Sequence, residues 1–172
     1  MPQQTQDQSH IVGTWFSVAT WILVLAIAGY FFNDYLEREK NPNQQVQSSV
    51  RADGTREVTL RSNRQGHYLA TGHINGHPVE IMLDTGASNV AVPQHLARQL
   101  GIHKGRSVEM ITANGMAKGY ATTITDIRIG DIRLRNVKAS LYPAVDDTVL
   151  VGMSFLKYLE FTQREDTLIL RQ

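Results

Sequence analysis

The sequence predicts a mainly β domain with one or two short helices, preceded by an N-terminal transmembrane helix. Three observations lead to this fold class. Residues 11–32 are uncharged and mostly apolar, residues 55–172 contain short stretches in which apolar and polar residues alternate, and Asn75-Gly76 separates two of those stretches. An uncharged apolar run of that length crosses the hydrocarbon of a bilayer as a helix, whereas alternation around an Asn-Gly pair is typical of a β-hairpin.

The composition excludes several classes of function. The 172 residues carry a formal net charge of +1 and include no cysteine. A disulfide framework, a thiol nucleophile and a zinc site built on thiolates are therefore excluded. Lys and Arg are scattered along the chain rather than clustered, so we expect no nucleic-acid partner. We also expect no cofactor.

The apolar run is the first element of the chain. We expect a short N-terminal tail at residues 1–10 and a transmembrane helix at residues 11–32, which would anchor the chain in a lipid bilayer. A buried core helix and a cleaved signal peptide are the alternatives. Ala26-Ile27-Ala28 has the small-x-small form of a cleavage site, but residues 1–10 lack the Lys or Arg of a signal peptide. An uncleaved anchor is the preferred interpretation.

The charges beside this run bear on its orientation. Arg38 and Lys40 follow it, and the residues before it contain no Lys or Arg. By the positive-inside rule this favours a C-terminal domain on the cytoplasmic side, although a long domain can translocate regardless of so small a bias. Charge alone therefore leaves the side of the membrane open.

The rest of the chain divides into a linker and one folded domain. Residues 33–54 are polar and lack apolar periodicity, so we expect a linker there, and residues 55–172 are numerous enough for a single core. A short helix is expected at residues 93–101, and a second near Met153. Alternation and turn residues predict strands at 56–62, 68–74, 78–83, 89–92, 107–112, 116–129, 132–141, 148–151, 160–162 and 167–170.

The Asn75-Gly76 turn fixes the register of one hairpin. A two-residue turn pairs the residues on either side of it, so we expect the pairs Ile74 with His77, Gly72 with Val79, Ala70 with Ile81 and Tyr68 with Leu83. One face of this hairpin is almost wholly apolar, and the other is half solvated. Asp84 then lies where the hairpin ends.

Three histidines in this region suggest an alternative site. His67, His73 and His77 are close enough in sequence to be metal ligands, but the expected register places His73 and His77 on opposite faces of the hairpin. A third and a fourth ligand would also have to come from elsewhere. We therefore expect surface histidines and no metal site.

The residues that are best suited to a catalytic role follow that hairpin. They are Asp84, Thr85, Gly86, Ala87 and Ser88, and they lie between the apolar stretches 81–83 and 89–92. This order places a carboxylate on a glycine-containing turn beside a hydrophobic core. The triplet alone is a weak signal, because the same residues also form ordinary β-turns.

Three segments together resemble a known family. Residues 81–88 resemble the active-site loop of aspartic proteases, in particular the single-lobed retropepsin-like enzymes, and residues 149–156 resemble the two-hydrophobics-then-glycine motif and following helix that close that fold. Residues 108–119 lie between them and resemble the flap hairpin. With the expected anchor, the chain resembles the bacterial membrane-anchored group of these proteases.

The resemblance implies a closed, single-lobed β domain that hydrolyses proteins or peptides. It implies a protease domain at residues 55–172 that faces the periplasm from the bacterial inner membrane. The implied site residues are Asp84 as catalyst, Thr85 as a brace between two loops, Gly86 for close backbone approach, Ala87 and Ser88 as supports of the loop, Leu150, Val151 and Gly152 as the structural motif, and Ala113, Asn114 and Gly115 as the flap. An ordinary hairpin turn is the alternative for the flap.

A second catalytic carboxylate has to come from another copy of the chain. Peptide hydrolysis by water needs a general base and a general acid, which two carboxyls sharing one proton supply. No other aspartate lies in an Asp-Thr-Gly triplet, so we expect a homodimer in which Asp84 meets its symmetry mate. The resemblance implies the same arrangement. The chain departs from retroviral enzymes at Met153, where they usually place an arginine that forms an intersubunit ion pair.

Two further expectations concern the dimer and the activity. Residues 167–170 are rather apolar for an exposed edge strand, so they are a candidate for cross-subunit pairing, with an ordinary core strand as the alternative. For the activity, the alternatives to an aspartic endopeptidase are a non-catalytic, membrane-tethered peptide-binding domain of the same fold and, more remotely, a metal hydrolase built on the histidines.

Overall fold

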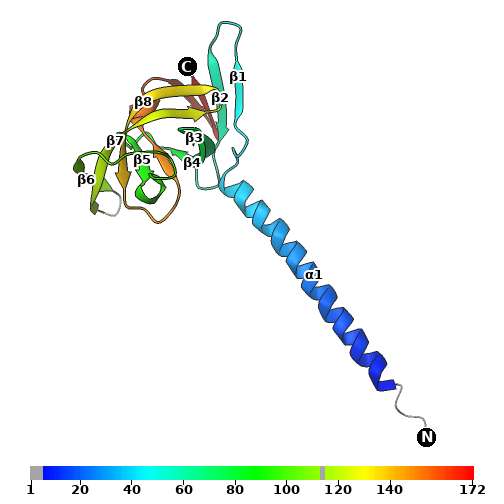
Figure 1. Cartoon of the computed structure of the whole chain (residues 1–172). Coiled ribbons are helices and arrows are strands. Elements are labelled where there is room, and N and C mark those ends of the chain that lie inside the picture. Colours follow the sequence, from blue (N-terminus) through cyan, green and yellow to red (C-terminus); the bar gives the residue numbers. More distant parts are fainter. Residues whose placement is uncertain (1–5, 113–114) are drawn as a thin grey trace. The chain divides into compact units, whose positions relative to one another are not determined.

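The computed structural model describes residues 6–112 and 115–172. The chain divides into two compact units, residues 1–38 and 39–172. The first contains most of one long helix and the second is built from strands (Figure 1). The mainly β class expected from the sequence is therefore confirmed, together with the apolar N-terminal helix.

Helix α1 spans Gln6–Lys40 and is longer than the expected transmembrane helix at both ends. It continues past residue 32 because no Gly or Pro follows until Pro42, and because Asp34 pairs with Arg38 one helical turn later, with 3.0 Å between carboxylate and guanidinium. The break at Asn41-Pro42 fits the rule that the residue before a proline disfavours helix.

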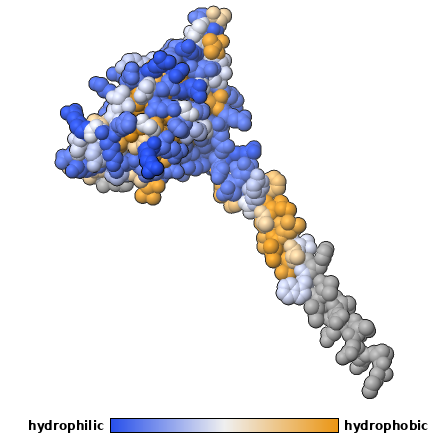
Figure 2. Space-filling model, viewed as in Figure 1, coloured by the Kyte–Doolittle hydropathy of each residue, from blue (hydrophilic) through white to orange (hydrophobic). Residues whose placement is uncertain are grey.

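The apolar side chains of α1 are exposed. Trp21, Leu25 and Phe31 are each more than 60% exposed, and hydrophobic residues gather along the described part of the helix (Figure 2). The segment Ser17–Lys40 is long and apolar enough to cross a membrane, by length and composition. This segment of α1 is therefore a candidate membrane span.

The prediction of a linker at residues 33–54 is wrong for much of that range. Its first part belongs to α1, and Gln47–Val50 form strand β1, which pairs with β2 (Arg56–Arg61). Asn43 is 5% exposed, and its side-chain amide donates to the carbonyls of Arg61 (2.8 Å) and Leu69 (2.6 Å). Polar composition suggested a tether, but these polar side chains satisfy backbone groups inside the fold.

The strands of the second unit form two sheets. The smaller sheet has the order β1-β2-β11-β10, and the larger has the order β3-β4-β9-β5-β8-β7-β6. A further pairing between β3 and β7 curls the larger sheet toward closure. The remaining strands are β3 (Tyr68–Ile74), β4 (His77–Leu83), β5 (Val90–Pro93), β6 (Ser107–Thr112), β7 (Gly115–Ile129), β8 (Ile132–Tyr142), β9 (Val149–Val151), β10 (Glu160–Arg164) and β11 (Thr167–Arg171).

The β3–β4 hairpin has the register expected from the sequence. Ile74 pairs with His77, and Tyr68 pairs with Leu83 at the other end. Asn75 and Gly76 have φ values of 50° and 87°, the left-handed conformation of a type I′ turn, which glycine and asparagine adopt most readily. The inward face of the hairpin joins a core of aliphatic side chains from both sheets, and Ile81 is fully buried there.

The helical elements of the second unit are short. Helix α2 spans Met153–Leu156, as expected, but the helix expected at residues 93–101 is regular only at Gln94–Leu96, as the 3₁₀ helix η1. The residues after η1 form turns as far as Gly101, which has a φ of 62°. A left-handed residue at that position stops the helix, and the few residues before it leave little room for a regular one.

Strand β11 does not provide a free edge for a second subunit. It lies between β2 and β10 and pairs antiparallel with both, so both of its edges carry hydrogen bonds within the chain. The expectation of cross-subunit pairing through residues 167–170 is therefore wrong, and the core-strand alternative holds. The apolar character of the strand has a simple reason, because Leu168 and Leu170 belong to the core.

Candidate active site

Asp84 is held where two parallel strands end. Strands β4 and β9 pair in parallel and align Leu83 with Val151. One residue further, the backbone N–H of Asp84 donates a hydrogen bond to the Val151 carbonyl at 3.1 Å. The triplet and the hydrophobic-glycine motif are therefore neighbours in the fold, although they lie far apart in the sequence.

The loop after Asp84 turns back on the carboxylate. The N–H of Gly86 donates to Oδ1 of Asp84 at 2.8 Å, and the N–H of Ala87 donates to its carbonyl at 3.2 Å. A Cβ atom at Gly86 would lie 3.1 Å from the same Oδ1 atom, so a side chain there would crowd the carboxylate. Asp84 itself is half-buried, and one of its oxygens is thus oriented by the backbone.

Gly152 permits the close packing of the loop against α2. A Cβ atom at this position would lie 2.3 Å from the carbonyl oxygen of Ala87 and 2.5 Å from that of Asn89. Just after it, the N–H of Met153 donates to the Ala87 carbonyl at 2.8 Å. Only glycine fits at such short distances from backbone atoms, which explains why the motif ends in this residue.

Ser154 is a structural residue that the sequence analysis missed. Its hydroxyl donates to the carbonyl of Lys138 at 2.7 Å and accepts from the N–H of Val90 at 2.9 Å. Its own N–H donates to the Ser88 carbonyl at 3.0 Å. The side chain thus joins α2 to β5 and β8, and the backbone N–H joins it to the loop. No sequence signal other than its place after Gly152 points to it.

Thr85 and Ser88 lie on the outer side of the loop. Both are exposed, and among the described residues the Thr85 side chain forms no hydrogen bond. A threonine without a partner beside an oriented carboxylate is available to a molecule that covers the loop. That molecule would meet Thr85 and Asp84 together.

The expected flap falls on the β6–β7 hairpin. Pairing runs from Ser107 with Tyr120 to Thr112 with Gly115, and residues 113–114 of the expected flap lie outside the described part of the chain. Gly115 has a φ of 105°, which favours glycine. Near this end Ile111 is 91% exposed and Met116, its cross-strand partner, is 73% exposed. The sequence analysis had not singled out this exposed apolar pair.

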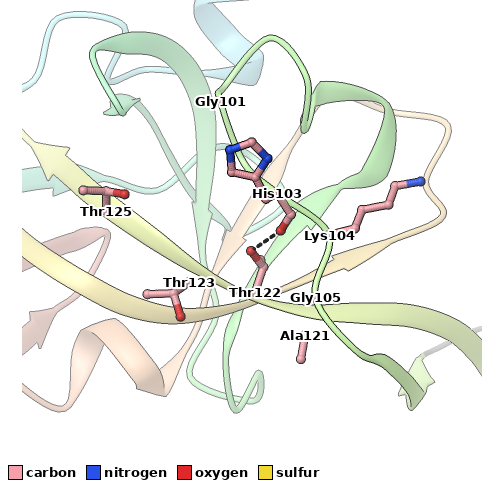
Figure 3. A pocket seen from close by; sticks show the side chains of 8 residues that line it. All are labelled: Gly101, His103, Lys104, Gly105, Ala121, Thr122, Thr123 and Thr125. Carbon is pink, nitrogen blue, oxygen red and sulfur yellow. Dashed lines mark hydrogen bonds between the residues drawn. The ribbon is translucent and has the colours of Figure 1, made fainter.

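Among the described residues, the loop at Asp84 contains one carboxylate, and no cluster of side chains forms a metal centre. Within residues 6–112 and 115–172, no group of three or more His, Asp or Glu side chains is placed to hold a metal ion. A hollow of about 480 Å³ lies elsewhere, at Gly101–Gly105 and the facing residues of β7 (Figure 3). Thr122 donates there to the His103 carbonyl at 2.7 Å, and Asp84 does not line the hollow.

The fold and the loop define a class of protein, the single-lobed aspartic proteases. Residues 70–158 match the family described as gag-polyprotein putative aspartyl protease, and the chain belongs to this family. Its structure resembles the crystal structure of a retropepsin-like aspartic protease from Rickettsia conorii, with a TM-score of 0.58 and 28% identity over 74% of this chain and 95% of that one. This protein is therefore a retropepsin-like aspartic protease by family and fold.

Two sequence relatives carry no functional description. An uncharacterized protein encoded in the cobV 5′ region of a Sinorhizobium species is 36% identical over 125 residues, which cover 70% of this chain. An uncharacterized protein of Rickettsia prowazekii (strain Madrid E) is 27% identical over 163 residues, 90% of this chain and 70% of that protein. The match with the Sinorhizobium protein spans only 54% of that protein, about half its length.

Proposed function

We propose that this chain is a membrane-anchored aspartic endopeptidase in which Asp84 of two copies forms the catalytic pair. One observation carries the proposal. The Asp84 carboxylate is half-buried and oriented by the Gly86 N–H, on a loop joined by hydrogen bonds to β9 and α2. A rigid loop of this kind can hold a carboxylate in a defined position toward a substrate and a second carboxylate.

The proposed chemistry needs two such carboxylates. In an aspartic protease one carboxylate takes a proton from the attacking water, while the partner carboxyl donates its proton to the carbonyl oxygen of the scissile bond. Like charges about 3 Å apart cannot both ionise, so the pair shares one proton. We therefore expect activity to favour mildly acidic pH.

A homodimer supplies the second carboxylate with the fewest assumptions. Asp84 lies in the only Asp-Thr-Gly triplet of the sequence, and the outer side of its loop is exposed. In a two-fold dimer one residue serves both halves of a site, because each loop meets its own copy across the axis. The Thr85 hydroxyl would then donate a hydrogen bond across that axis and brace the two loops.

The proposed substrate is an extended segment of a protein or peptide. The β6–β7 hairpin carries the exposed pair Ile111 and Met116 close to its tip. An exposed apolar pair at a hairpin end gains favourable burial when an apolar segment lies beneath it. The hairpin would in this way cover a bound peptide and limit access of water to the carboxylates.

The proposed location is the bacterial inner membrane, with the protease domain in the periplasm. Helix α1 supports an anchor by its length and its exposed apolar side chains. An anchor would also favour the dimer, since confinement to a bilayer raises the local concentration of partner domains. The periplasmic side follows from the family resemblance rather than from the flanking charges.

The experiment that tests the activity compares three forms of the full chain in detergent. The wild type, Asp84→Asn and the control Asp146→Asn, which changes an exposed aspartate outside the loop, are incubated with an unfolded protein from mildly acidic to neutral pH. Mass spectrometry then identifies the cleavage products. Cleavage by the wild type and the control, but not by Asp84→Asn, is the expected result.

The other outcomes would contradict the proposal in different ways. If no form cleaves while all are folded and dimeric, the chain is a peptide-binding domain of the same fold. If the wild type and Asp84→Asn cleave equally, Asp84 is not the catalyst. Inhibition of cleavage by a metal chelator would instead point to a metal hydrolase.

A further inference from the structure

Folding brings Arg56 beside three arginines of the β7–β8 hairpin. Arg56, Arg128, Arg133 and Arg135 line a hollow of about 400 Å³, together with Gly130 and Asp131. All four arginine side chains are exposed. Arg128 lies on β7, Arg133 and Arg135 lie on β8, and Arg56 lies on β2, so only the fold brings Arg56 to the other three. A small basic hollow therefore exists on a chain whose overall net charge is only +1.

The positive charge of this hollow is only partly neutralised within the described part of the chain. Arg133 pairs with Asp126, and Asp131 accepts a hydrogen bond from the Ser48 hydroxyl at 2.6 Å. Arg128 and Arg135 form no ion pair with any carboxylate among the described residues. Positive charge on this face is therefore available to an external anion.

Two of these arginines are direct neighbours. Arg128 and Arg133 are cross-strand partners in the β7–β8 hairpin. Like charges directly opposite each other in a sheet destabilise the pairing. A bound anion between them would relieve that repulsion. Arg133 is already paired with Asp126, so the anion would add to this partial neutralisation of the two charges.

A second basic hollow adjoins the first. It has a volume of about 370 Å³ and is lined by residues of β8 and α2, together with Lys157 and Tyr158, which follow α2. Arg135 lines both hollows. We use the term basic stripe for the cationic side chains of the two hollows, which are Arg56, Arg128, Arg133, Arg135, Lys138 and Lys157.

The chemistry of the stripe favours phosphate groups. A guanidinium presents a planar fork of N–H donors that matches phosphate oxygens, and a lysine ammonium adds a point charge. Two joined hollows suit several phosphates at neighbouring positions better than one isolated ion. The surface of a membrane that contains anionic lipids presents such an array.

The proposed anchor makes that surface the nearest source of phosphate. Residues 33–40, the last part of α1, separate the expected span at residues 11–32 from Asn41, which is buried in the second unit. With so short a connection, the folded unit cannot move far from the headgroups if α1 spans the bilayer. The local concentration of lipid phosphate around the folded unit would then be high.

We propose that the basic stripe binds the phosphates of anionic phospholipid headgroups in the membrane that α1 spans. The inference rests on the anchor of the proposed function, but not on its proteolytic activity. Binding at the stripe would fix one face of the protease domain toward the membrane surface. Orientation of the domain would then depend on the lipid composition.

The test measures the distance of the stripe from lipid headgroups in the full chain. Because the sequence contains no cysteine, Tyr158→Cys gives a single site for a fluorophore beside the second hollow. The chain, carrying Asp84→Asn to prevent self-cleavage, is placed in nanodiscs that contain a headgroup-labelled nitroxide quencher. One set of discs contains phosphatidylcholine alone, and the other also contains phosphatidylglycerol.

We expect quenching that is several-fold stronger in the discs with phosphatidylglycerol. Arg128→Gln combined with Arg135→Gln should reduce it to the level of phosphatidylcholine alone. The matched control combines Arg98→Gln with Arg106→Gln, which removes the same charge from exposed positions outside the stripe, and should leave quenching unchanged. Thermal unfolding of each variant shows whether the fold is retained.

Several results would overturn the inference. Equal quenching in the two kinds of disc, or an equal effect of the two double variants, would contradict it. So would a fluorescence response to inorganic phosphate at matched ionic strength that depends on Arg128 and Arg135 and occurs without a response to phosphatidylglycerol. The same response to polyglutamate would indicate an acidic protein partner. Failure of the chain to enter the discs would disprove the anchor, and this inference with it.

Discussion

The backbone N–H of Asp84 donates a hydrogen bond to the carbonyl of Val151 at 3.1 Å. This bond extends the parallel pairing of β4 with β9 by one residue, to the point where the carboxylate leaves the sheet. The position of Asp84 is therefore set by the strand that precedes it and by a second strand from the other end of the domain. Changes in that second strand should affect the site without touching it.

Gly152→Ala tests the packing of the loop against the residue that follows this second strand. The new Cβ atom would lie 2.3 Å from the Ala87 carbonyl oxygen, so the loop or α2 must move. We expect a loss of roughly 1–3 kcal/mol in the free energy of unfolding, as for other overpacked positions. Chemical denaturation of the full chain in detergent measures it. Gly29→Ala, at a position with no atom within 4 Å of the added Cβ, is the control, and equal stability of the two variants would contradict the packing described here.

Asn43→Ala tests the structural role of the segment before β1. The Asn43 amide donates to the carbonyls of Arg61 and Leu69, and its oxygen accepts from the Arg61 N–H at 2.8 Å. Loss of these bonds leaves buried backbone groups without partners, which costs about 1–3 kcal/mol. Gln44→Ala, at an exposed position, should leave the unfolding free energy unchanged. A flexible linker at this position would make both substitutions neutral.

Glu57 gives the stability of the smaller sheet a predictable pH dependence. Hydrogen bonding from Arg171, at 2.7 Å, and the nearby charge of Arg51 lower the pKa of Glu57 below its ordinary value of 4.5. A carboxyl with a lowered folded-state pKa stabilises the fold above its unfolded-state pKa and loses that contribution as the pH falls through the folded-state value.

The pH dependence is tested with Glu57→Gln. The wild type should melt at a higher temperature than the variant at neutral pH, and the difference should shrink as the pH falls below about 4.5. Glu109→Gln, at an exposed glutamate without an ion pair among the described residues, should show no such trend. A difference that stays constant or grows in acid would contradict the assignment.

Ile111→Ser tests the proposed contact between the β6–β7 hairpin and a substrate. If Ile111 covers a bound peptide, its replacement should raise KM roughly fivefold, which corresponds to about 1 kcal/mol of lost apolar contact, with little change in kcat. Val145→Ser removes an equally exposed apolar side chain outside the hairpin and serves as the control. Equal KM values for the two variants would show that the hairpin does not contribute to substrate binding.

The sequence predicted those parts of the fold that depend on local signals. The β3–β4 register followed from Asn75-Gly76 and from alternation, because the turn type alone fixes which residues pair. The burial of Asn43 could not be foreseen, since its partners, Arg61 and Leu69, are brought to it only by folding. Strand β11 looked like an edge for the same reason, because its two neighbours in the sheet were unknown.

The candidate site shows the same division. The Asp84 loop was predicted from a short motif between two apolar strands, and its neighbour Gly152 from a second motif. Ser154 was missed, because a serine that links three backbone segments has no sequence signature of its own. The basic stripe was also missed. Arg128, Arg133 and Arg135 lie within eight residues of the sequence, but only folding brings Arg56 beside them.

The central claim is that two Asp84 side chains, one from each copy, form a single catalytic pair. Mixing wild type with Asp84→Asn in detergent, at a constant total protein concentration and after exchange of subunits, tests it directly. Since only dimers with two aspartates are active, an equal mixture should show about one quarter of the activity of the same amount of wild type. About one half, the value for copies that act independently, would contradict the shared pair.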